Sequence, residues 1–135
     1  MRTETLSIST GPTSTVVDLT RDAARFVATA GEGLLNVFVP HATAGIAIIE
    51  TGAGSDTDLL DAIERILPRD DGLYRHRHGA TGHGADHVLP AWLSPSAVVP
   101  VVDGRLMLGT WQSIVLVDTN VDNRLRRVVL SFVEG

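Results

Sequence analysis

The chain has 135 residues, of which 44% are hydrophobic and 20% are charged, and this balance excludes a disordered protein. Sixteen acidic residues against 11 basic ones give a net charge of −5, which argues against a nucleic-acid partner because such proteins carry basic surfaces. Every basic residue is arginine, so chemistry that requires a lysine, such as Schiff-base formation, is excluded.

Cysteine is absent, and this excludes both a disulfide framework and a thiolate zinc site. The first residues carry charge without an apolar segment behind them, so we expect no signal peptide. The longest apolar runs, such as residues 44–49, are far shorter than the roughly 20 residues that a membrane span needs. We therefore expect one domain over residues 1–135, in the cytoplasm and without a membrane partner.

The first half of the chain mixes strands and helices. Alternating or continuous runs of β-forming residues predict strands at 3–9, 14–19, 34–39 and 46–50. Gly11-Pro12 marks a turn, and we expect the first two strands to pair as a hairpin. Apolar residues at helical spacing predict one helix capped by Thr20 and another capped by Ser55 or Asp56 and closed by Pro68.

The last third of the chain is predicted to be β. Strands are expected at 88–93, 96–102, 106–118 (with a possible break at Gly109) and 125–133. Asp103-Gly104 is a strong signal for a two-residue hairpin turn. Strands and helices do not alternate regularly, which favours an α+β fold: a largely antiparallel sheet or sandwich with two helices.

The histidines are the most informative feature of the sequence. All five lie between positions 41 and 87, and four of them fall in residues 73–87: His41, His76, His78, His83 and His87. On a strand, His76 and His78 would point to the same side. On a helix, His83 and His87 would share a face, although the flanking glycines weaken the helical interpretation. Converging neutral imidazoles suit Zn²⁺ or a similar ion with one position open for water. The alternative is a polar loop with solvated histidines.

Other polar residues have two interpretations each. Glu50 ends an apolar strand. In a functional interpretation it is a metal ligand, a hydrogen-bond partner of an imidazole or a general base; in the other it is an ordinary strand-end carboxylate. Arg75 and Arg77 alternate with histidines and either clamp a phosphate or carboxylate or serve as surface or interface charges. For Trp111, a core or interface position is the simpler interpretation.

Several stretches together resemble the YjbQ family, whose members are often labelled "secondary thiamine-phosphate synthase". The match covers nearly the whole chain. Its pieces are Pro40-His41-Ala42-Thr43-Ala44-Gly45-Ile46 with Glu50, Arg75-His76, Asp86-His87, and Pro100 followed by Asp103-Gly104-Arg105-Leu106-x-Leu108-Gly109-Thr110-Trp111-Gln112.

The resemblance implies a compact α+β domain that assembles as a homotrimer. It also implies a metal or anion site near a subunit boundary, formed by His41, His76 and His87 with Glu50 beside them. His78 and His83 stand where the family varies. Under this resemblance, Trp111 and Gln112 become candidates for the wall of a substrate site.

The resemblance further implies an enzyme that joins a pyrimidine-methyl pyrophosphate to a thiazole phosphate and releases pyrophosphate. His41 and Glu50 would be its catalytic groups. The chain departs from the family pattern at Ile49, usually Asn, and at 89–92, where basic and small residues are usual. Arg75 and Arg105 would then hold the phosphates.

Ligand chemistry keeps two other functions open. Pyrophosphate reactions normally use Mg²⁺ on oxygen ligands, whereas imidazoles favour Zn²⁺ or another transition metal. One alternative is therefore a transition-metal hydrolase or lyase acting on a small phosphate or carboxylate substrate. The other is a non-catalytic trimer that binds a metal or anion.

Overall fold

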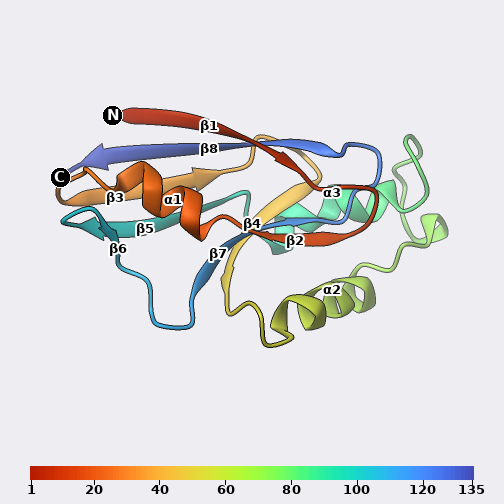
Figure 1. Cartoon of the computed structure of the whole chain (residues 1–135). Coiled ribbons are helices and arrows are strands. Elements are labelled where there is room, and N and C mark those ends of the chain that lie inside the picture. The colour runs from red at the N-terminus through yellow and green to blue at the C-terminus, as the bar shows by residue number, and fades with distance from the viewer.

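The structure is a computed structural model that describes all residues, 1–135. Three α-helices, one short 3-10 helix and eight strands follow one another along the chain (Figure 1). In order they are β1 (Arg2–Ser9), β2 (Thr15–Asp18), α1 (Thr20–Val27), β3 (Gly33–Phe38), β4 (Ala44–Ile49), α2 (Ser55–Ile66), the 3-10 helix η1 (Asp71–Leu73), α3 (His83–Trp92), β5 (Ser96–Val102), β6 (Arg105–Leu106), β7 (Ser113–Asp118) and β8 (Leu125–Glu134).

The strands form two sheets in which every pairing is antiparallel. One sheet has five strands in the order β1-β8-β3-β5-β6, and the other has three in the order β2-β7-β4. The predicted α+β class with largely antiparallel pairing is confirmed, with one helix, α3, beyond the two expected. No helix has the length and apolar character needed to cross a bilayer.

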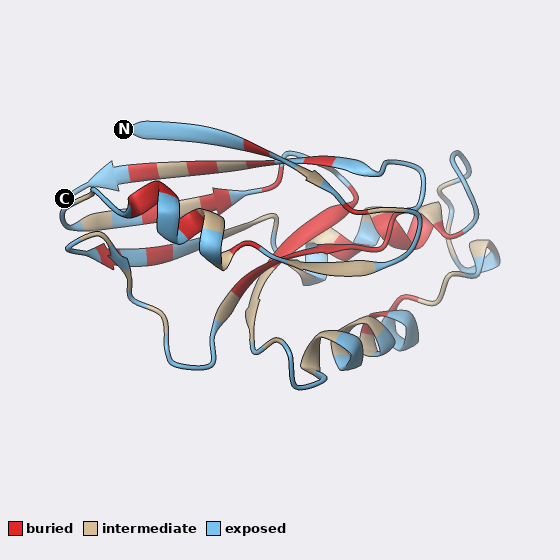
Figure 2. Cartoon of the chain, viewed as in Figure 1, coloured by how far each residue is buried: buried red, intermediate tan, exposed pale blue.

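Strand β7 is the centre of the fold because it is buried on both faces (Figure 2). Ile114 and Leu116 belong to the main core, together with α1 and the inner face of the five-stranded sheet. Val115 and Val117 point the other way and pack with residues of α2 and α3 in a smaller core. The layers are therefore the five-stranded sheet, then α1 with the three-stranded sheet, then α2 with α3.

The expected hairpin between the first two strands is wrong. β1 pairs along its whole length with β8, whereas β2 pairs with β7 in the other sheet. The chain crosses between the sheets at Thr10, whose N–H donates to the Arg124 carbonyl. Burial decides this arrangement, since Leu6 then packs into the main core. A turn signal in the sequence shows where the chain bends, but it does not show whether the two flanking strands pair with each other.

The expected strand over 88–93 is also wrong, because these residues belong largely to α3. Ala85, Leu89 and Leu93 recur every fourth residue and pack in the core beside β7. Gly84 permits close packing, since a side chain there would clash with Tyr74. Tertiary packing therefore overrides the β-propensity of this short apolar run.

Two local predictions in the last third are confirmed. Asp103 and Gly104 both have positive φ, 48° and 71°, and they join β5 to β6 in the expected hairpin. The strand expected over 106–118 is interrupted around Gly109, so that β6 ends at Leu106 and β7 begins at Ser113.

Candidate metal centre

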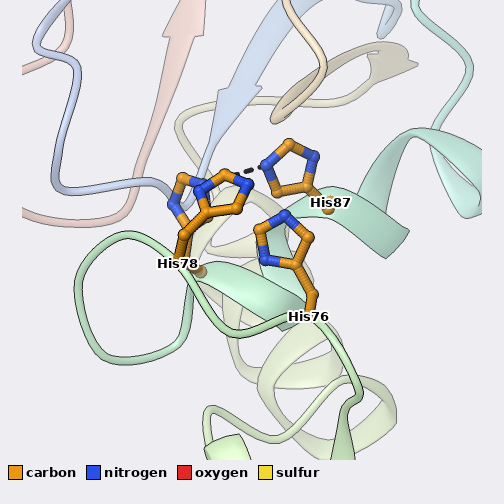
Figure 3. Close-up of side chains that lie close together, drawn as sticks. His76, His78 and His87 are labelled. Atoms are coloured by element: carbon orange, nitrogen blue, oxygen red, sulfur yellow. Dashed lines mark hydrogen bonds between the residues drawn. The ribbon is translucent and has the colours of Figure 1, made fainter.

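Four imidazoles converge at one end of the molecule. One ring nitrogen from each of four histidines lies within 4.8 Å of the others: His76, His78, His83 and His87. The rings of His76 and His78 are 3.9 Å apart between centroids, and those of His76 and His87 are 4.3 Å apart (Figure 3). The Nε2 atoms of His83 and His87 are 2.9 Å apart. We call these four residues the histidine cluster.

Helix α3 supplies two members of the cluster. His83 and His87 are four residues apart, so a helix places them on the same face, one turn from each other. The ring of His83 lies against the backbone at Gly79, where a side-chain Cβ would be 2.5 Å from its Cγ. Gly79 also has φ of +86°, so two requirements favour glycine there.

The other two members come from the segment between η1 and α3, which has neither helical nor strand structure. Backbone contacts hold this loop in place. Asp71 accepts hydrogen bonds from the middle and the end of the loop, from the Arg77 guanidinium to its carbonyl and from the Gly82 N–H to its carboxylate. Asp122, in the turn before β8, accepts a hydrogen bond of 3.0 Å from the Ala80 N–H.

A buried ion pair fixes the start of α3 against the three-stranded sheet. Asp86 is 1% exposed and binds the Arg69 guanidinium. Thr119 donates to the same carboxylate at 2.7 Å, and Arg69 also donates to the carbonyls of Thr119 and Thr81. Asp86 is therefore a structural residue, although it stands next to a member of the cluster.

The surroundings favour neutral imidazoles. Burial lowers the pKa of His76, and the charges of protonated His78 and His83 would lower it further. The pKa of His87 is lowered by burial first and by the neighbouring histidines next, against a smaller opposing effect of Asp86. Neutral imidazole is the form that binds metal ions.

The cluster meets the requirements of a transition-metal site. Zn–N bonds of about 2.0–2.1 Å imply nitrogen atoms roughly 3.3 Å apart around a tetrahedral ion. The cluster nitrogens are up to 4.8 Å apart, so the most distant pair would approach by about 1.5 Å to reach that spacing. Nδ1 of His76 and Nδ1 of His83 are buried and have no hydrogen-bond partner in the protein. Buried polar atoms without a partner are uncommon, because leaving one unpaired costs free energy. Nδ1 of His83 does lie near a carboxylate, at 3.1 Å from Oδ2 of Asp122.

The structure brings together two of the three metal ligands that the resemblance implied. His76 and His87 are in the cluster, but His41 is not. Nε2 of His41 instead accepts a hydrogen bond of 3.0 Å from the Arg127 N–H, which directs Nδ1 away from this contact. The pKa of His41 is lowered by burial and by Arg126 and Arg127. Within one chain, His78 and His83 take the place that the prediction gave to His41.

The other predicted site residues are not gathered around the cluster. Glu50 follows β4 and is exposed, next to the end of the sheet where β7 begins. Trp111 and Gln112 lie in the loop before β7, and Trp111 is 72% exposed, which contradicts a core position in this chain. Arg105 is in the β5–β6 hairpin, at the opposite end of the molecule from the loop that carries the cluster (Figure 1).

Arg75 is the one predicted substrate-binding residue on the cluster's own loop. It precedes His76 and its side chain is exposed. Two residues that sequence reasoning set aside, His78 and His83, belong to the cluster. The spacing of His83 and His87 was the available signal, but it has meaning only once that segment is known to be helical.

Comparison with known proteins identifies relatives over the full length. A family model described as "UPF0047 protein YjbQ-like" matches residues 4–135. The chain is 63% identical over 136 residues to UPF0047 protein Rv2556c of Mycobacterium tuberculosis, with 100% of both chains covered. It is 36% identical over 115 residues to UPF0047 protein YugU of Bacillus subtilis, which covers 82% of this chain and 84% of YugU.

The fold is also shared with solved structures. The crystal structure of hypothetical protein APE1520 from Aeropyrum pernix K1 superposes with a TM-score of 0.88, at 32% identity and with 100% of both chains covered. The family model, the curated relatives and the solved structure therefore point to the same family. The protein belongs to the YjbQ-like UPF0047 family.

Proposed function

We propose that the histidine cluster binds one divalent transition-metal ion, zinc or a similar ion, and that the protein is a metal-dependent hydrolase or lyase acting on a small phosphate or carboxylate substrate. The observation that supports this proposal is the convergence of four imidazole nitrogens within 4.8 Å. Imidazole ligands suit zinc, copper, iron and nickel, whereas Mg²⁺ prefers oxygen. A bound transition metal supplies Lewis acidity and lowers the pKa of water.

The chain's own residues would control access to this ion. His76, His78 and His83 line a pocket of about 80 Å³, which has room for water or a small functional group. His78 lies on the exposed loop, whereas His83 and His87 are fixed by α3. Arg75 on the same loop is the residue best placed to attract an anionic substrate, and its exposed side chain is free to turn towards it.

We further propose that the protein is a homotrimer. The outer face of the five-stranded sheet carries Leu34, Val98 and Val133, each about half exposed at 50%, 55% and 50%. Leu34 pairs with Val133 in the sheet, so these side chains form part of one apolar surface. Assembly is also the arrangement in which His41 and Glu50 of a neighbouring copy remain candidates for the catalytic site.

The synthase reaction has less support from the geometry than the hydrolase or lyase. Pyrophosphate release requires arginines and an oxygen-bound Mg²⁺ around one site. Arg105 lies at the opposite end of the molecule from the cluster. The cluster ligands are nitrogen atoms. A Mg²⁺-dependent assay with the pyrimidine-methyl pyrophosphate and thiazole phosphate tests this alternative, and rapid pyrophosphate release would favour it.

Elemental analysis of the purified protein after incubation with Zn²⁺, Mn²⁺ or Ni²⁺ tests the metal site. We expect about one ion per chain, and loss of that ion in His76→Ala and His87→Ala. His78→Ala and His83→Ala separate the two ligand sets, with His41→Ala as the matched variant outside the cluster. Loss in His41→Ala together with full retention in the other two would favour the set implied by the resemblance. No ion on the wild-type protein would refute the proposal.

A substrate panel tests the reaction. The metal-loaded protein would be assayed against small phosphate monoesters, carboxylate esters and phosphorylated hydroxy acids. We expect turnover of at least one class that disappears when a chelator removes the ion and returns when zinc is restored. A protein that holds the ion but turns over none of them would be better described as a metal-binding module.

A further inference from the structure

Asp122 touches the histidine cluster from a different part of the chain. It lies in the turn between β7 and β8, whereas the cluster belongs to α3 and to the loop between η1 and α3. Its Oδ2 atom is 3.1 Å from Nδ1 of His83 and 3.0 Å from the backbone nitrogen of Ala80. One carboxylate oxygen therefore meets both an imidazole of the cluster and the loop that carries His78.

The turn that holds Asp122 is itself anchored in the buried part of the fold. The Asp122 N–H donates to the side chain of Asn120 at 2.6 Å. Asn120 is 3% exposed, and its own N–H donates to the buried carboxylate of Asp118 at 3.0 Å. The backbone at Asp122 is thus anchored to the end of β7, while its carboxylate reaches the loop through Ala80.

The two ring nitrogens of His83 face different partners. Nε2 is 2.9 Å from Nε2 of His87, inside the cluster, while Nδ1 faces Asp122. The 3.1 Å distance from Nδ1 to Asp122 suits a hydrogen bond, but the ring is not aligned for one. Histidines that bind metals usually donate their second ring N–H to a carboxylate or carbonyl, which fixes the tautomer and the ring orientation.

We infer that Asp122 is a positioning residue for the metal site: in the metal-loaded protein it accepts the Nδ1–H of His83, so that Nε2 of His83 faces the ion. This inference rests on the proposed metal site. The same carboxylate keeps the loop in register through Ala80. Asp71 and Asp86 also lie near the cluster, but their hydrogen bonds go to the backbone, to Thr119 and to arginines.

The test compares two carboxylates that hold the same loop. Asp122→Asn keeps an oxygen that can accept from Ala80 but removes the negative charge facing His83. Asp71→Asn makes the same change at a residue that accepts from Gly82 and forms no hydrogen bond or ion pair with an imidazole. Zinc affinity, measured by chelator competition, is expected to fall about 10- to 100-fold in Asp122→Asn. We expect a smaller change, below about threefold, in Asp71→Asn.

Nitrogen NMR of the histidine rings supplies a readout that a purely structural role would not affect. In zinc-loaded wild type, we expect His83 to carry its proton on Nδ1, with a slowly exchanging, downfield proton signal. That signal should move or disappear in Asp122→Asn while the backbone spectrum outside the loop stays the same. Asp122→Ala, which also removes the oxygen, should weaken zinc binding at least as much.

Three outcomes separate the inference from the proposal on which it rests. Zinc bound by wild type and weakened selectively in Asp122→Asn supports both. Zinc bound equally by wild type and Asp122→Asn, with an unchanged His83 signal, would overturn the role of Asp122 and leave the metal site standing. Absence of zinc binding in wild type would overturn the metal site and the inference with it.

Discussion

Two sets of polar side chains, the Arg126–Asp118 network and the histidine cluster, lie at the same end of the three-stranded sheet. They differ in how many of their polar atoms have hydrogen-bond partners in the protein. Arg126 and Asp118 are each 1% exposed and form a two-point ion pair at 2.7 and 2.9 Å. Thr10 and Thr43 complete it, one donating to the carboxylate and the other accepting from the guanidinium. In the histidine cluster, by contrast, Nδ1 of His76 and of His83 have no hydrogen-bond partner in the protein.

This difference distinguishes a structural polar group from a site. Native proteins pair buried polar atoms because leaving one unpaired costs on the order of 1–3 kcal/mol. The Arg126–Asp118 network follows that rule and needs nothing further. The histidine cluster packs four bases together, with the Asp122 carboxylate beside only one of them, and the proposed metal ion would bind their nitrogen lone pairs. The following predictions test the contrast, from the largest expected effect to the smallest.

Breaking the satisfied network should have the largest effect on stability. Asp118→Ala leaves the Arg126 charge buried without a partner, so the free energy of unfolding should fall by about 3–5 kcal/mol. Denaturant unfolding measures this loss. Replacing both residues, as in Asp118→Leu with Arg126→Met, should cost less than the single change. A loss below about 1 kcal/mol in Asp118→Ala would contradict the structural role.

The histidine cluster should respond to metal, and the network should not. Zinc at about 100 times its Kd should stabilise wild type by about 2.7 kcal/mol. For a chain of this size that corresponds to a rise in Tm of roughly 10 °C. His76→Ala combined with His87→Ala should show no such rise in thermal denaturation. An equal rise in this double variant would place the zinc site elsewhere.

The metal-free protein should lose stability as the pH falls below about 6.5. The pKa of His76 and of His87 is lowered in the folded protein, whereas the unfolded chain titrates near 6.5. Above that pH both states are neutral and the effect vanishes. Below it the unfolded chain binds protons that the folded protein does not, so the free energy of unfolding decreases.

The same measurement in a variant identifies the groups responsible. His76→Gln with His87→Gln should flatten the pH dependence of unfolding between about pH 6.5 and pH 5. His41 would still contribute to the slope, because its pKa is also lowered in the folded protein. An unchanged pH dependence of the free energy of unfolding in the double variant would contradict the lowered pKa of the cluster histidines.

The smallest effect is expected at Trp111, which belongs to neither group. Its side chain is 72% exposed, so Trp111→Ala should change the free energy of unfolding of a single chain by no more than about 0.5 kcal/mol. Sedimentation run alongside denaturation would detect a role in assembly. A loss well above this value with unchanged assembly would contradict the exposed position of the side chain.

Local signals in the sequence were sufficient for some features. Asp103-Gly104 predicted its hairpin because a two-residue turn depends only on its own backbone angles. The crowding of four imidazoles into residues 73–87 indicated a candidate site, and the resemblance to the YjbQ family selected His76 and His87 among them. The α+β class followed from the irregular order of strands and helices.

Features decided by distant residues were not predictable in the same way. The pairing of β1 with β8 joins the two ends of the chain, and no local pattern encodes it. Residues 88–93 form helix rather than strand because α3 packs against β7. His83 was set aside because the family varies at its position, and the face that it shares with His87 is defined only once the segment is known to be helical. Asp122 is likewise a turn residue that no local pattern marks, and only the fold places it beside His83.

A crystal structure of the zinc-loaded protein, with anomalous data collected at the zinc edge, would test the central claim most directly. The account predicts one anomalous peak per chain, about 2 Å from ring nitrogens of His87 and of at least two other members of the histidine cluster. A peak bound by His41 without His78 and His83, or no peak at the cluster in protein shown to contain zinc, would contradict it.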